Sequence, residues 1–71
     1  MKRIIKTCQD DEKLLYIELN WNGKQTYNVE VWEMRTNAWG FLTPVFLKEQ
    51  KRFVGEKEQA EKYFYRQCYT Q

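Results

Sequence analysis

The clearest pattern in the chain lies in LYIELNWNGKQTYNVEV, residues 15–31. Apolar and polar side chains alternate strictly from Leu15 to Trp21, and the alternation returns from Tyr27 to Val31. A period of two is typical of a strand with one buried face. Asn22-Gly23 between the two segments is a strong signal for a hairpin turn. The segment therefore predicts an antiparallel β-hairpin.

Side-chain parity predicts the register of this hairpin, because residues opposite one another in an antiparallel pair share a face. A two-residue turn at Asn22-Gly23 would place Ile17 opposite Asn28 and mix apolar with polar side chains. A three-residue loop of residues 21–23, with Gly23 in the left-handed conformation of a G1 bulge, places Ile17 opposite Tyr27. We therefore predict the bulged loop.

Further strands flank the hairpin on both sides. The second strand continues through residues 32–35, a turn follows at residues 36–40, and residues 41–47 form a third strand-like run. Pro44 removes a backbone donor, so this strand is predicted to lie at an edge or to carry a bulge. Residues 48–52 are predicted to form a charged connection, and Ile4-Ile5 predicts an N-terminal strand that joins the sheet.

The hydrophobic period changes from two to about four after Gly55. Ala60, Phe64 and Cys68 recur every fourth residue, which is typical of an amphipathic helix. Gly55 is predicted at the N-cap, and Glu58 and Lys62 are spaced for a favourable pair. The helix is therefore predicted to begin near Glu56.

These elements predict an α+β fold: a small antiparallel meander of three to four strands, with one C-terminal amphipathic helix packed on one face. At 71 residues the chain has room for a single hydrophobic core, so residues 1–71 are expected to form one domain. The predicted core consists of Leu15, Ile17, Leu19, Val29, Val31, Phe41, Ala60, Phe64 and Cys68.

Composition removes several classes of enzyme. The chain contains neither His nor Ser, so it lacks the parts of a Ser-His-Asp hydrolase and the base of a Cys-His protease. Cys8 and Cys68 are its only soft ligands, too few for a structural zinc site. Its three glycines are far apart and cannot form a phosphate-binding loop. We expect a non-enzymatic protein with no metal and no cofactor.

The N-terminus has no signal-peptide pattern, and no apolar run is long enough for a membrane helix. The sequence therefore predicts a cytoplasmic protein that does not bind membranes. Cys8 and Cys68 would form a disulfide in an oxidising compartment, but in the cytoplasm we expect two reduced, half-buried thiols.

Aromatic residues supply the candidate binding site, since 12 of the 71 residues are Phe, Trp or Tyr. The register places aromatic and sulfur-containing side chains on the sheet face that the helix leaves uncovered, and Trp and Tyr are enriched at interface centres. The candidate partner-binding residues are Tyr16, Trp32, Met34, Trp39 and Tyr65.

Nucleic-acid binding is the alternative, because exposed rings can stack on bases while cations follow the phosphates. The candidate contacts are two basic clusters that would converge into one rim: Lys2, Arg3 and Lys6, with Lys48, Lys51 and Arg52. The net charge is only +2, and Glu18 and Glu30 on the aromatic face would repel phosphates.

We therefore expect a small protein-binding module that acts as an inhibitor or adaptor, with a homodimer as one possible arrangement. Its size and character match, by analogy of class alone, the inhibitors that phages and mobile elements direct against host defence proteins. A nucleic-acid-binding accessory or regulatory protein is the second hypothesis.

Overall fold

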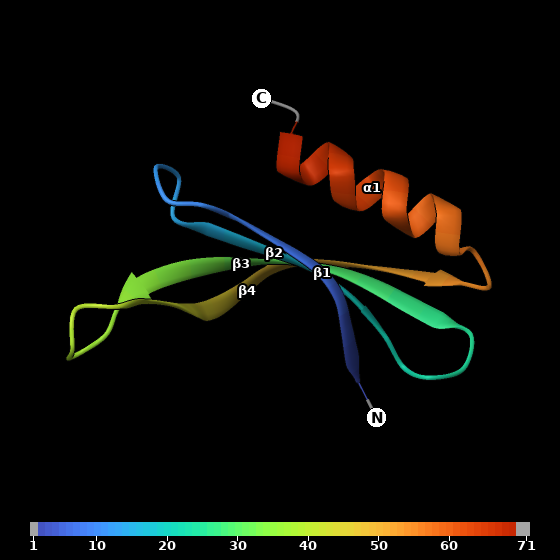
Figure 1. Cartoon of the computed structure of the whole chain (residues 1–71), viewed down its shortest axis with the longest axis horizontal. Helices are drawn as coiled ribbons and strands as arrows, with labels where there is room; N and C mark the ends of the chain where they lie inside the picture. The colour runs from blue at the N-terminus through green and yellow to red at the C-terminus, as the bar shows by residue number, and fades with distance from the viewer. Residues whose placement is uncertain (1, 70–71) are drawn as a thin grey trace.

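The computed structural model describes residues 2–69 and contains a four-stranded sheet and one helix (Figure 1). In chain order these elements are β1 (Arg3–Asp10), β2 (Leu15–Trp21), β3 (Thr26–Thr36), β4 (Leu42–Val54) and α1 (Lys57–Tyr69). The strands pair antiparallel in the order β1-β2-β3-β4. The predicted α+β meander with a C-terminal helix is confirmed.

The β2–β3 hairpin has the predicted faces but a different register. Ile17 lies opposite Val31 and Leu19 lies opposite Val29, so the predicted pairing of Ile17 with Tyr27 is wrong by four residues. The loop has four residues, 22–25, because the Asn22 side chain organises it. Asn22 Oδ1 accepts hydrogen bonds from the backbone amides of Lys24 and Thr26 at 2.8 and 3.1 Å.

The β3–β4 loop uses the same device. Asn37 Oδ1 accepts hydrogen bonds from the backbone amides of Trp39 and Phe41 at 2.9 and 3.0 Å. In both loops the backbone amide of the asparagine also donates to the carbonyl four residues later. One carboxamide thus satisfies two amides that a sheet ladder cannot pair at a hairpin end.

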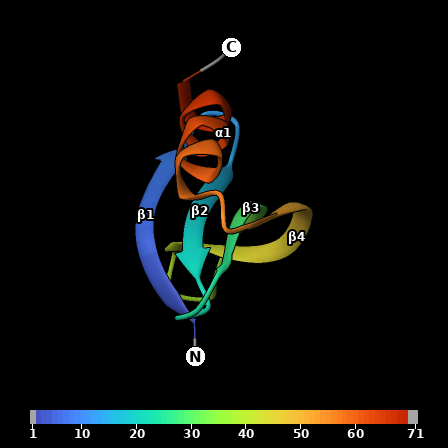
Figure 2. The same ribbon diagram turned by 90° about the vertical axis from the view of Figure 1, so that its right-hand side faces the viewer.

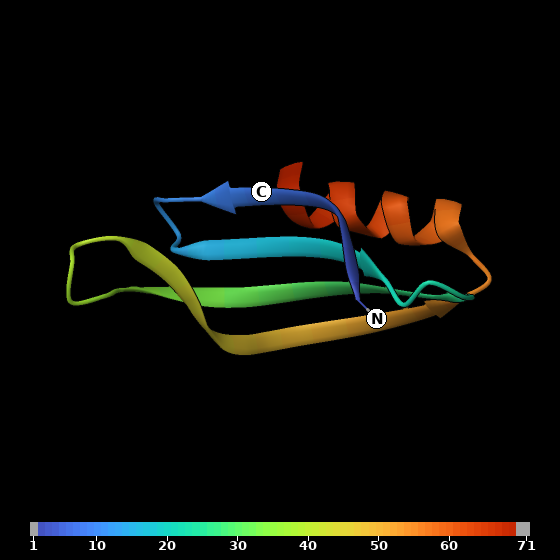
Figure 3. The same cartoon turned by 60° about the horizontal axis from the view of Figure 1, so that its bottom comes forward.

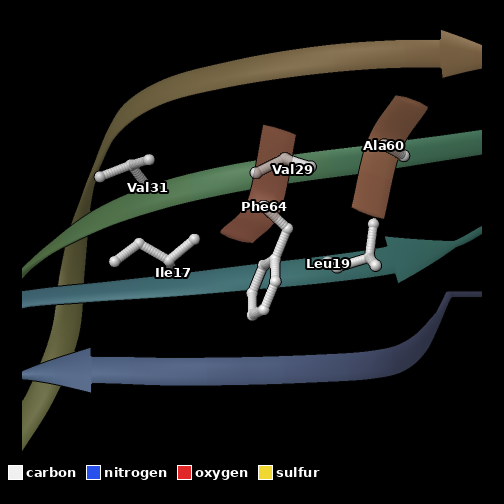
Figure 4. Packing of buried hydrophobic residues seen from close by; sticks show 6 residues of the cluster. All are labelled: Ile17, Leu19, Val29, Val31, Ala60 and Phe64. Atoms are coloured by element: carbon white, nitrogen blue, oxygen red, sulfur yellow. The ribbon is translucent and has the colours of Figure 1, made fainter. Parts of the chain in front are cut away.

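The hydrophobic core lies between α1 and the face of the sheet that carries the apolar alternation (Figure 4). Its fully buried members are Ile17, Leu19, Val29, Val31, Ala60 and Phe64. Leu15 and Cys68 pack against this cluster as half-buried residues. Phe41 is the error in the predicted core, because it lies in the β3–β4 loop and is 68% exposed.

β4 is longer than the sequence pattern indicates. Residues 48–52, predicted to be a connection, belong to the strand because β3 continues to offer backbone partners: Asn28 lies opposite Arg52 and Glu30 lies opposite Gln50. The prediction for Pro44 is confirmed in both respects. β4 is an edge strand, and its register skips Val45, between the pairs Met34–Pro44 and Glu33–Phe46.

The start of α1 also differs from the prediction. Gly55 is not the N-cap; it turns the chain out of β4 with a φ of +70° and donates a 2.7 Å hydrogen bond to the Gln25 carbonyl. The first helical hydrogen bond runs from the Ala60 amide to the Glu56 carbonyl at 3.0 Å. Glu56 therefore occupies the N-cap position, one residue later than predicted.

Cys8 and Cys68 form a disulfide, so the preference for two reduced thiols is corrected. Cys8 lies opposite Ile17 on the face of the sheet that α1 covers, and Cys68 lies one turn after Phe64. This placement brings the two Cα atoms to 6.3 Å, within the usual range for a disulfide. The bond connects the C-terminal end of α1 to the edge strand β1.

The sheet is strongly twisted (Figures 2 and 3). The N-terminal end of β1 bends across the face opposite the helix, at an irregularity in the register between Ile4 and Lys6. At the other edge the C-terminal half of β4 runs beneath α1 (Figure 1). The face opposite the helix is therefore partly covered by the chain itself.

Candidate functional site

The face opposite α1, called the polar face below, carries the first group of predicted partner-binding residues. Tyr16 lies directly opposite Trp32, and Glu18 lies directly opposite Glu30. The prediction that these residues share a face is confirmed, but the face is not open. Glu18 is only 4% exposed and Met34 only 1%, while Tyr16 and Trp32 are half-buried. Met34 is therefore removed from the binding site.

Glu18 is the centre of a hydrogen-bonded network on the polar face. Its carboxylate accepts hydrogen bonds from Tyr16 Oη at 2.9 Å and Asn20 Nδ2 at 2.7 Å, and pairs with Lys2 Nζ at 3.0 Å. Burial alone would raise the pKa of Glu18, but these donors and the Lys2 charge outweigh it and lower the pKa below its ordinary value. Burial and the same contact raise the pKa of Tyr16 to about 12.

Glu30 forms a second group on the same face. It accepts hydrogen bonds from Trp32 Nε1 at 3.0 Å and from Gln50 Nε2 at 3.3 Å. Asn28 donates to Asn20 Oδ1 at 3.3 Å, while its own buried Oδ1 has no partner in the described residues. The polar groups of this face are thus largely used on one another, which makes the face a structural network.

Several large apolar side chains of the β3–β4 hairpin are exposed. We call this group the hairpin patch; its members are Trp39, Phe41, Val45, Phe46 and Leu47, all exposed. Trp39 is 80% exposed, the highest value among the large hydrophobic side chains of residues 2–69. Of the predicted partner-binding residues, Trp39 is the most exposed.

Tyr65 is separate from this patch. It lies on α1, is 41% exposed, and stacks on Tyr69 with ring centroids 6.0 Å apart. Lys6 Nζ lies 5.4 Å from the centroid of the Tyr65 ring, and this contact raises the pKa of Lys6. The Tyr65 ring, on the outer side of α1, therefore contacts Lys6 of β1 within the chain.

The two predicted basic clusters do not converge into one rim, because β1 and β4 are opposite edges of the sheet. Several of their members also have partners within the chain. Lys2 pairs with Glu18, Arg3 lies 5.9 Å from the Trp21 ring centroid, and Lys6 lies over Tyr65. The remaining members, Lys48, Lys51 and Arg52, all lie on β4 and are exposed.

A groove between α1 and β4 was not predicted from the sequence. It has a volume of about 210 Å³ and is lined by Lys51, Phe53, Gln59, Lys62, Tyr63 and Arg66. We call it the α1–β4 groove. Its four helical residues, Gln59, Lys62, Tyr63 and Arg66, are spaced to lie on one face of α1. This spacing is the only indication of the groove in the sequence. Their proximity to Lys51 and Phe53 depends on how the helix crosses the sheet.

Comparison of the chain with protein-family models, with curated proteins and with solved structures finds no match. Within residues 2–69 there is no helix that is long and apolar enough to span a membrane. The same residues contain no group of three or more His, Cys, Asp or Glu side chains that would suit a metal ion. The candidate sites are therefore the hairpin patch and the α1–β4 groove.

Proposed function

We propose that the protein is a protein-binding module that inserts the hairpin patch into an apolar pocket on its partner. One observation carries this proposal: Trp39 and Phe41 in the β3–β4 loop are 80% and 68% exposed, and the adjoining residues Val45, Phe46 and Leu47 of β4 are exposed as well. Several exposed large apolar side chains close together in a small chain are typical of an interaction site. Such a surface gains free energy when a partner removes it from water.

The backbone that presents Trp39 is held before any partner binds. Asn37 accepts hydrogen bonds from the amides of Trp39 and Phe41, and the Gly40 amide donates to the Asn37 carbonyl at 3.1 Å. Gly40 has a φ of +86°, a conformation that favours glycine. An ordered loop loses less conformational entropy on binding, which favours its use as a recognition element.

Trp39 is the expected anchor of the contact. Interfaces depend on a few residues, Trp foremost, that fill pockets near the centre of the contact. Phe41 is also highly exposed, at 68%, so both rings can enter a pocket without unfolding the sheet. A narrower form of the proposal, an inhibitor encoded by a phage or mobile element against a host defence protein, is supported by analogy of size alone.

The test is site-specific photocrosslinking with the full chain. A photoreactive amino acid replaces Trp39 in one sample and Glu12, in the β1–β2 turn, in a matched control. We expect the photoreactive residue at position 39 to form a covalent adduct with a partner protein. An excess of wild-type protein should abolish this adduct by competition, whereas an excess of Trp39→Ala protein should not. An adduct that both competitors abolish equally would contradict the proposal, as would an adduct formed equally well from position 12.

A second measurement covers the other possible occupants of the patch. Sedimentation of the purified protein across a range of concentrations detects self-association, and titration with labelled single-stranded and duplex nucleic acid detects binding to phosphates. We expect a monomer and no salt-dependent nucleic-acid binding. A dimer that Trp39→Ala dissolves would assign the patch to a second copy of this chain.

A further inference from the structure

The α1–β4 groove brings three cationic side chains from two elements to one place. Lys51 comes from β4, while Lys62 and Arg66 lie one turn apart on α1. All three are exposed, and Phe53 and Tyr63 form the apolar wall of the groove. Figure 1 shows the C-terminal half of β4 running beneath α1 at this edge. The groove therefore combines positive charge with an apolar wall.

Within residues 2–69 no ion pair neutralises the positive charges of the groove. Among residues 2–69 no carboxylate lies within ion-pair distance of Lys51, Lys62 or Arg66, and the predicted pair of Glu58 with Lys62 is not formed. Glu49 is the acidic group next to the groove. Together with burial, its charge raises the pKa of Tyr63, and the charge of Arg66 opposes this rise. The balance in the groove remains cationic.

The strand that borders the groove is an edge strand with a regular segment. From Glu49 to Val54 every residue of β4 pairs in register with β3, and the register irregularities of β4 lie before this segment. The outer edge of β4 faces no other strand in the described part of the chain. An edge of this kind can accept an extended peptide as an additional strand.

The charge on this segment indicates which peptide would fit. Lys51 and Glu49 lie on the side of β4 that faces the helix, opposite Val29 and Val31, whereas Arg52 lies on the other side, opposite Asn28. Lys62 and Arg66 of the helix line the groove together with Lys51. An added strand would place its side chains beside these cations. Carboxylates at those positions would form charge-assisted hydrogen bonds with them.

We infer that the α1–β4 groove binds an extended acidic segment of a protein partner, which pairs with the Glu49–Val54 edge and places a carboxylate among Lys51, Lys62 and Arg66. This inference rests on the proposed function, because it gives the same partner a second contact. The ring faces argue against nucleic acid. Lys51 Nζ lies 5.8 Å from the Phe53 centroid and 5.0 Å from the Tyr63 centroid, so a stacking base would have to displace it.

The experiment uses fluorescence anisotropy with the full, oxidised chain and labelled model peptides. The probe is a short peptide of alternating Val and Glu; the controls are alternating Val and Lys, and alternating Pro and Glu. Proline keeps the charge but cannot pair as a strand. We expect the Val-Glu peptide to bind and both controls to bind at least about tenfold more weakly. Equal binding of the Pro-Glu peptide would overturn the strand pairing.

Two charge-reversed variants with the same net charge as each other locate the site. Lys62→Glu changes the groove, while Lys24→Glu changes an exposed lysine in the β2–β3 loop. We expect Lys62→Glu to weaken the Val-Glu peptide about tenfold and Lys24→Glu to leave it nearly unchanged. Equal losses would show general charge attraction and overturn the site. Tighter binding of a single-stranded oligonucleotide than of the peptide would assign the groove to phosphates instead.

The outcome is independent of the hairpin patch. If Trp39→Ala fails to compete for the crosslinked adduct but the Val-Glu peptide does not bind, only the groove inference fails. If the peptide binds and no adduct depends on Trp39, the hairpin patch fails and the groove stands as the recognition site.

Discussion

Glu18 and Glu30 lie directly opposite each other on β2 and β3, and both are more than nine-tenths buried on the face that the helix does not cover. Two like charges opposite one another would destabilise an antiparallel pair. Here each carboxylate is satisfied by different donors: Glu18 by Tyr16, Asn20 and Lys2, and Glu30 by Trp32 and Gln50. The pair is therefore part of the structure of the sheet.

Acid is expected to weaken the fold through Glu18. Because its pKa in the folded protein lies below the ordinary value of 4.5, the native state binds this proton less tightly than the unfolded chain does. Glu18 therefore makes its full contribution to the stability of the fold above about pH 4.5. This contribution disappears as the pH falls through the lower pKa that Glu18 has in the folded protein. Urea unfolding followed by Trp fluorescence, from neutral pH to about pH 3, measures this loss.

Glu18→Gln is the control for this prediction. It keeps the size of the side chain and removes the titrating group, and we expect it to cost about 1–2 kcal/mol at neutral pH. Its free energy of unfolding should fall less steeply in acid than that of the wild type. Parallel curves for the two proteins would show that Glu18 does not carry the acid dependence.

Reduction of the Cys8–Cys68 disulfide is expected to destabilise the protein strongly. The bond closes a loop across 60 residues, and the loss of this constraint on the unfolded chain corresponds to about 4 kcal/mol. Urea midpoints with and without reductant measure the difference. The Cys8→Ala/Cys68→Ala variant should match the reduced protein and should not respond to reductant. A wild-type midpoint that reductant leaves unchanged would contradict the assigned role.

The same measurement bears on the expected location. A cytoplasmic protein would have its thiols reduced and would fold without this bond. A reduced protein that unfolds at ambient temperature would be incompatible with that location, and a folded one would be compatible with it.

Phe64 is expected to be the main anchor of α1. It is 2% exposed and fills the space between Ile17, Leu19 and Val29, and Ala60 is the other buried residue of the helix (Figure 4). Phe64→Ala should cost about 3–5 kcal/mol. Thermal unfolding followed by circular dichroism measures this effect, with Tyr65→Ala as the matched control on the exposed side. Equal losses from the two variants would refute the packing.

Trp32 tests whether the polar face has a binding role in addition to its structural one. Trp32 is one of the candidate partner-binding residues, and on that basis Trp32→Ala would leave the monomer folded and weaken the partner contact. The structure adds a cost, because Trp32 is half-buried and its loss leaves Glu30 with one fewer donor. We expect a folded protein destabilised by about 1–3 kcal/mol that still competes for the Trp39 adduct. Failure to compete while folded would return Trp32 to the interface.

The residues of the hairpin patch and of the α1–β4 groove differ in how far sequence could predict them. Trp39 is one of the predicted partner-binding residues, and it lies in the turn predicted at residues 36–40. Lys62 and Arg66 gave no comparable signal, because charged residues on a helix usually lie on a solvated face. Their relation to Lys51 appears only when α1 is placed against β4.

The amino-acid sequence by itself determined the elements and their faces. Alternation with a period of two separates Ile17 and Leu19 from Glu18, and the change of period after Gly55 specifies the helix, because both periods are local properties of the backbone. The tertiary structure decided the register of the strands and which elements lie side by side. A shift of the register by four residues keeps every face, so only the Asn22 loop fixes Ile17 opposite Val31. Likewise, the disulfide and the burial of Glu18 require β1 to lie beside β2, a contact that no local pattern encodes.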